Sequence, residues 1–191
     1  YAPMGFWSTG GFMAVQGLWA SRWMAVLENL DAAAVAARLT WMGITMLAGF
    51  LGIGFFATRL VQRGLSLALL YQWAMVLAAV ALGMICLWPQ FAGALLWPML
   101  GGCFSLANIA YSLVAQAFPP HWSGRASTAF NLLVFAGAFG LQWGIGGLVD
   151  ALHAAGLSSA EAYRAAFGLL LGCQLLALVW FMFPRRATTD R

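Results

Sequence analysis

Six long apolar runs, separated by short polar breaks, constrain this chain more than any other feature of its sequence. A helix that crosses a bilayer needs about 20 mostly apolar residues, and each run is long enough. The runs cover residues 4–26, 39–58, 65–88, 91–117, 126–149 and 162–183. We therefore predict an all-α, polytopic membrane protein whose six transmembrane helices form one domain, residues 1–184, followed by a cytoplasmic tail at 185–191.

The composition excludes a water-soluble domain and favours a lipid bilayer as the main partner. Of 191 residues, 63% are hydrophobic and 7% are charged, whereas an average globular chain is about a quarter charged. The formal charge of +4 comes from scattered Arg residues, so nucleic acid is not an expected partner. The three Cys residues have no C-x-x-C spacing, and we predict no metal site and no cofactor. Because the chain begins at Tyr1, we interpret it as a piece of a longer protein.

The distribution of Arg predicts the orientation in the membrane. One side holds three Arg residues beside four carboxylates: Arg22, Arg38, Arg164, Glu28, Asp31, Asp150 and Glu161. The other side holds the six remaining Arg residues: Arg59, Arg63, Arg125, Arg185, Arg186 and Arg191. Cytoplasmic loops carry an excess of Arg and Lys. We therefore expect both ends of this segment to lie in the cytoplasm of a cell with the protein in its inner membrane.

The fifth run combines a polar stripe with a glycine stripe. Asn131 and Gln142 are eleven residues apart, which places them about 20° apart around a helix. Small residues at a spacing of three and four let another helix approach closely. Four glycines on the opposite side of the run have that spacing, which predicts a helix-packing face: Gly137, Gly140, Gly144 and Gly147.

The fourth run also has a polar face, whereas the third and sixth runs are nearly uniform in hydrophobicity and are predicted to face lipid. Five polar or small residues of the fourth run fall within one arc: Gly101, Ser105, Asn108, Ser112 and Gln116. In the first run, Gln16 is the polar candidate. Asn and Gln side chains in membrane helices can bond to a neighbouring helix without any ligand. We favour a water-lined cavity, because a dry interface rarely needs five polar positions on one helix.

Three segments resemble parts of the C-terminal six-helix half of a major facilitator superfamily transporter. Residues 16–23 (QGLWASRW) are similar to the seventh helix of bacterial members, and residues 124–131 (GRASTAFN) to the eleventh. Residues 54–64 (GFFATRLVQRG) resemble the second copy of the family's cytoplasmic loop motif. Thr58 replaces the acidic residue of that motif, so the charge-relay latch of the family lacks its carboxylate here. Four positions of the motif remain: Gly54, Arg59, Arg63 and Gly64.

The resemblance implies half of a secondary carrier that moves a small-molecule substrate by alternating access, with a missing N-terminal six-helix half as partner. By position, the first, second, fourth and fifth runs would line the substrate cavity. The expected cavity residues are Gln16, Trp19, Asn108, Tyr111, Asn131 and Gln142. The two aromatic residues of this set have packing as an alternative role. No carboxylate lies inside a predicted span, so we expect any proton-relay residue to lie in the other half.

Two other classes of membrane protein are alternatives to a carrier. An intramembrane enzyme is not expected, because no Ser and His share neighbouring spans and no H-E-x-x-H motif occurs. We therefore predict no catalytic residues. A structural or sensory helix bundle that transports nothing stays open as an alternative.

Overall fold

The computed structural model describes residues 1–91 and 93–183, apart from the side chains of residues 58, 91, 93 and 94. Every element within these ranges is helical, so the predicted all-α class is confirmed there. The predicted tail at 185–191 lies outside the described residues.

Residues 4–27 form one rod, which we name the first helix. It consists of four successive segments: η1 (Met4–Gly10), α1 (Gly11–Ala14), η2 (Val15–Trp19) and α2 (Ala20–Leu27). The segments η1 and η2 are π-helical, a rare form that occurs mostly as short bulges and often at functional sites. No single segment reaches the length of a membrane span, although the rod covers the predicted first span.

Five further helical stretches are long and apolar enough to cross a membrane: Ala32–Ala57, Leu67–Leu87, Leu95–Gln116, Pro120–Ala154 and Ser159–Met182. They belong to α3 (Ala32–Gln62), α4 (Leu67–Leu87), the rod made of α5 (Gly93–Ser105), η4 (Leu106–Asn108) and α6 (Ile109–Gln116), α7 (Pro120–Ala154) and α8 (Ser159–Met182). A short 3-10 turn, η3 (Pro89–Phe91), precedes α5.

The helices extend beyond the predicted spans because polar caps and turn residues set their ends. α3 begins where the Asp31 side chain accepts a hydrogen bond from the Ala34 amide at 2.8 Å. It continues through Gln62 and ends at Gly64, whose φ of +85° allows the turn that closes the helix. α7 begins at Pro120, a residue favoured in the first turn. The predicted breaks at 59–64 and 118–125 are therefore too long.

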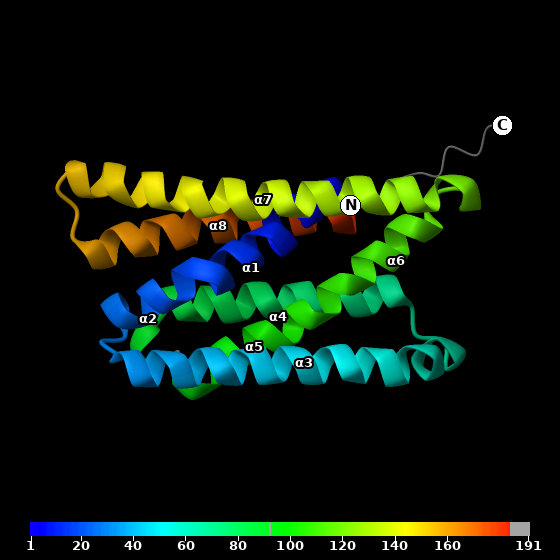
Figure 1. Cartoon of the computed structure of the whole chain (residues 1–191), viewed down its shortest axis with the longest axis horizontal. Helices are drawn as coiled ribbons and strands as arrows, with labels where there is room; N and C mark the ends of the chain where they lie inside the picture. Colours follow the sequence, from blue (N-terminus) through cyan, green and yellow to red (C-terminus); the bar gives the residue numbers. More distant parts are fainter. Residues whose placement is uncertain (92, 184–191) are drawn as a thin grey trace.

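Two long helices flank the molecule, α7 on one side and α3 on the other (Figure 1). The first helix and the α5–α6 rod run between them. α3 packs on α5, and α7 packs on η1 and α1. α4 contacts α5 and α8, and α6 crosses to α7.

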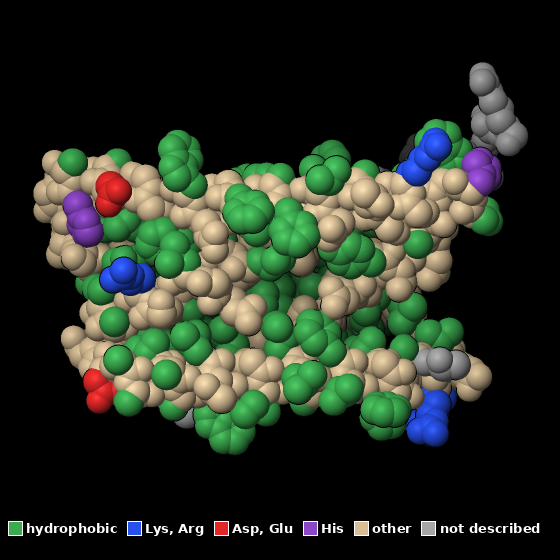
Figure 2. All heavy atoms as spheres, in the orientation of Figure 1, with side chains coloured by type: hydrophobic (Ala, Val, Ile, Leu, Met, Phe, Trp, Pro, Cys, Tyr) green, Lys and Arg blue, Asp and Glu red, His purple; other side chains and the backbone are tan. Residues whose placement is uncertain are grey.

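The charged side chains lie at the two ends of the bundle (Figure 2). One end holds the described carboxylates together with Arg22, Arg38 and Arg164, and we name it the acidic end. The opposite end, which we name the basic end, holds Arg59, Arg63 and Arg125. The first helix runs toward the acidic end, and the chain then reverses direction from each long rod to the next (Figure 1).

The burial of the helices differs from the sequence prediction. Only 6% of the most apolar 18-residue stretch of α3 is buried, whereas 44% of the corresponding stretch of α4 and 33% of that of α8 are buried. α4 and α8 thus each bury one face in the core, and the predicted contact with lipid is left to the opposite face. Gln174 of α8 is itself buried, and its amide donates to the Trp7 carbonyl at 3.2 Å.

Candidate functional site

The face between α3 and α7 exposes the first helix and the α5–α6 rod, and Figure 2 shows that this face is hollowed along its middle. The outline of the molecule is also indented between α3 and α6 at the basic end. The six residues predicted to line a cavity all belong to the first helix, the α5–α6 rod or α7. The hollowed face is therefore the candidate functional site.

The polar face of the fourth run is divided into two parts. A Cβ atom on Gly101 would lie 2.6 Å from the Met42 carbonyl oxygen, and Ser105 is buried against Gly49. These two positions pack on α3. Beyond them the rod leaves α3 and packs on α7 and α4, and Asn108, Ser112 and Gln116 are exposed. Only the second part of the predicted stripe is therefore open to a ligand.

Tyr111 and Asn131 meet between α6 and α7. The Tyr111 hydroxyl donates to Asn131 Oδ1 at 2.7 Å, and both side chains are half-buried. The Tyr111 ring also contacts Phe130 edge-to-face, with 5.0 Å between the ring centroids. Tyr111 thus packs and at the same time presents a polar group beside Asn108, which lies three residues earlier on the same helical side.

Trp19 and Gln142 meet between the first helix and α7. The Trp19 indole donates to the backbone carbonyl of Gln142 at 3.1 Å, so the Gln142 amide group keeps its own hydrogen-bonding capacity. That amide borders a depression of about 570 Å³ on the acidic-end half of α7, lined by Leu18, Phe139, Gln142, Trp143, Gly146, Gly147 and Asp150. This second pair lies about 16 Å along α7 from Asn131, at 1.5 Å per residue.

Gln16 lies in the π segment η2 and is half-buried. Among the described residues, neither Gln16 nor Asn108 makes a side-chain hydrogen bond. A side-chain amide within a membrane must be hydrogen-bonded, so an amide without a protein partner needs water or a ligand. The structure therefore leaves the amides of Gln16 and Asn108 available for a solute, and it joins the four other predicted positions in two inter-helix pairs.

The predicted glycine stripe makes close contacts over only part of its length. A Cβ atom on Gly137 would lie 3.0 Å from two backbone carbon atoms of Phe6. From the other side, a Cβ atom on Gly10 would lie 2.6 Å from the Val134 carbonyl oxygen. Gly140 is looser, at 3.9 Å from the Phe6 ring. A Cβ atom on Gly144 or Gly147 would meet no described neighbour within 4 Å, so their role in helix packing stays a prediction.

The loop-motif residues lie at the basic end of α3. Gly54 is exposed with no described neighbour within 4 Å, and Gly64 makes the turn after the helix. Arg59 and Arg63 are exposed, and the Arg59 guanidinium lies 6.0 Å from the centre of the Phe56 ring. The side chain of Thr58 lies outside the described residues.

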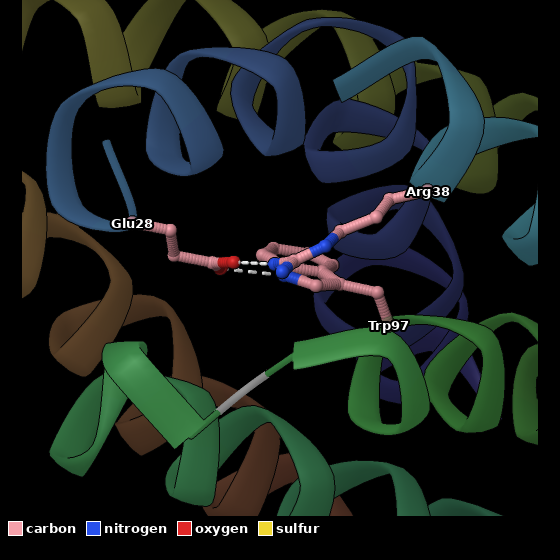
Figure 3. Close-up of polar contacts among 3 residues, drawn as sticks. All are labelled: Glu28, Arg38 and Trp97. Carbon is pink, nitrogen blue, oxygen red and sulfur yellow. Dashed lines mark hydrogen bonds and ion pairs between the residues drawn. The ribbon is translucent and has the colours of Figure 1, made fainter. Parts of the chain in front are cut away.

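Sequence reasoning missed a buried charged cluster at the acidic end (Figure 3). The Glu28 side chain is 3% exposed, accepts a hydrogen bond from Trp97 Nε1 at 2.8 Å and pairs with the guanidinium of Arg38. The sequence placed Glu28 in a solvated break. The spacing of residues along the sequence does not indicate this cluster, because residues 28, 38 and 97 belong to three different helices.

Comparison with protein families, with curated proteins and with solved structures gave no match to this chain.

Proposed function

We propose that this chain is the C-terminal six-helix half of a secondary transporter of the major facilitator type, which moves a small solute by alternating access. The observation that carries the proposal is an internal repeat in the helix packing. Transporter folds of this kind are built from inverted repeats of three helices within each six-helix half.

The repeat relates the first three rods to the last three. The first helix packs on α7 and α8, and the α5–α6 rod correspondingly packs on α3 and α4. The contact of α2 with α3 has its counterpart in the contact of α6 with α7, and α4 contacts its counterpart α8. α7 also packs on α8, whereas their counterparts α3 and α4 make no comparable contact with each other among the described residues. Equivalent rods run in opposite directions through the bundle (Figure 1), as an inverted repeat requires.

The polar groups of the hollowed face support a solute pathway on the axis of this repeat. The first helix and the α5–α6 rod occupy equivalent positions and carry Gln16 and Asn108, respectively. Tyr111, Asn131, Trp19 and Gln142 border them from the contacts with α7. In the complete carrier the other six-helix half would cover this face, with α3 and α7 as its flanks. The two ends have equal numbers of described Arg residues, and the sequence that follows α8 at the basic end adds three more Arg residues. This excess favours a cytoplasmic location of the basic end.

The test is solute flux into vesicles that contain the full-length protein, screened with a mixture of labelled small solutes. We expect uptake of at least one solute, and a loss of that uptake in Asn108→Ala and Gln16→Ala. Leu176→Ala, at a 72% exposed position of α8, is the matched control and should transport normally. Uptake that survives both cavity substitutions would refute the assignment of the site.

The reading frame that precedes Tyr1 provides a second test. Six further apolar spans there would agree with the proposal. A start codon directly before Tyr1, together with the absence of flux, would favour a structural or sensory helix bundle instead.

A further inference from the structure

The buried charged cluster of Glu28, Arg38 and Trp97, which we name the clamp, joins three helices at the acidic end through one buried carboxylate. Glu28 ends the first helix, Arg38 lies in the second turn of α3, and Trp97 lies in α5 (Figure 3). The Trp97 side chain is fully buried, and the Arg38 side chain is 22% exposed. A buried carboxylate that loses its partners retains an uncompensated charge. Separation of these three helices at this end is therefore strongly disfavoured.

Further contacts bind the acidic-end half of α3 to α5. The Thr45 hydroxyl donates to the Pro98 carbonyl at 2.7 Å. The close approach of Gly101 to Met42, and of Gly49 to Ser105, continues this interface up to the end of α5. From Arg38 to Gly49, α3 is thus fixed to its neighbour.

The basic-end half of α3 has no comparable support. Beyond Gly49, no described side chain of α3 is buried within this chain, although Ile53 packs against the core half-buried. In the acidic-end half, by contrast, Val35 and Met42 are buried. The α5–α6 rod bends away at η4, and α6 packs on α7 and α4 instead. Figure 1 shows this divergence, and Figure 2 shows the resulting indentation of the surface.

We propose that α3 is a lever, clamped at the acidic end by Glu28, Arg38 and Trp97, whose basic-end half swings relative to α6 about the Gly49–Ser105 contact. The swing opens or closes access to Asn108, which lies directly beyond this contact. Its use as a gate rests on the proposed transport function, whereas the movement itself does not. The clamp residues are positioning residues in this proposal, because they act through α3 and not on a solute.

The test measures distances between spin labels in the full-length protein in lipid nanodiscs, with the three native cysteines replaced by Ala. The acidic-end pair is Ala37 with Leu95, and the basic-end pair is Val61 with Gln116, all at exposed positions. We expect a narrow distance distribution for the first pair and a broad or two-peaked one for the second. Equally narrow distributions for both pairs would overturn the lever.

The clamp is tested by Arg38→Met, which should broaden the acidic-end distribution at least twofold. Trp97→Phe, which removes only one hydrogen bond and keeps an aromatic ring, should broaden it less and serves if the first variant does not fold. Arg22→Met, at an exposed position of the same end, is the control and should change neither pair. An unchanged acidic-end distribution in both clamp variants would overturn the role of the cluster. These distances are measured without any solute. The test of the lever is therefore independent of whether the protein transports a solute.

Discussion

Replacement of Gly137 by Ala tests the contact between the first helix and α7. A Cβ atom there would clash with the Phe6 carbonyl oxygen and would also lie 3.0 Å from two backbone carbons of Phe6, whereas ordinary contacts begin at 3.4 Å. The backbones must therefore separate, and no rotamer change relieves the clash. Overpacking of this kind costs about 1–3 kcal/mol, from which the better helix propensity of Ala recovers about 1 kcal/mol. We expect a net loss of up to about 2 kcal/mol.

Gly144→Ala is the matched control in the same helix, because its Cβ atom would meet no described neighbour. It should gain up to about 1 kcal/mol from propensity alone. The propensity gain is common to both variants, so they should differ by the overpacking cost alone, about 1–3 kcal/mol. For a chain of this size this corresponds to roughly 2–12 °C in Tm. Thermal unfolding followed by tryptophan fluorescence in detergent measures the difference. Equal Tm values, or a lower value for Gly144→Ala, would refute the close crossing at Gly137.

Two further substitutions probe polar contacts between helices. Tyr111→Phe removes the hydrogen bond to Asn131 and should lower stability by about 0.6–1.5 kcal/mol, measured by the same unfolding assay; an unchanged Tm together with unchanged amide exchange in α6 would argue against the bond. Gln174→Leu keeps the volume but leaves the Trp7 carbonyl without this donor, so we expect a loss of about 1 kcal/mol and faster hydrogen exchange in η1 by mass spectrometry. Protection of η1 at the wild-type level would show that this amide does not support the π segment.

The sequence was informative on helices and less so on their ends. Hydropathy detects only the part of a helix that suits hydrocarbon, so the polar first turn of α7 and the last turn of α3 were predicted as breaks. Asp31 is a typical cap residue, and its position before the Ala-rich start of α3 marks that end of the helix in the sequence. The sequence shows no pattern that marks the π segments of the first helix.

The candidate site was predicted by angular positions around straight helices. On the continuous helix α7, Asn131 and Gln142 are both half-buried, and their place in a substrate cavity stays a prediction. Along the fourth run the angular positions do not distinguish Ser105, which packs on α3, from Asn108, which is exposed, because the rod leaves α3 beyond α5. The Glu28 cluster depends on the arrangement of three helices, which no local pattern contains.

The account depends most on water reaching the amides of the hollowed face. The direct measurement replaces Gln16, Asn108, Asn131 and Leu176 one at a time by Cys in the full-length protein and follows modification by a membrane-impermeant thiol reagent. A thiol reacts readily only where water allows the thiolate to form. The account predicts modification at the three amide positions and none at Leu176, which faces outward on α8. Equal protection at all four positions would contradict it.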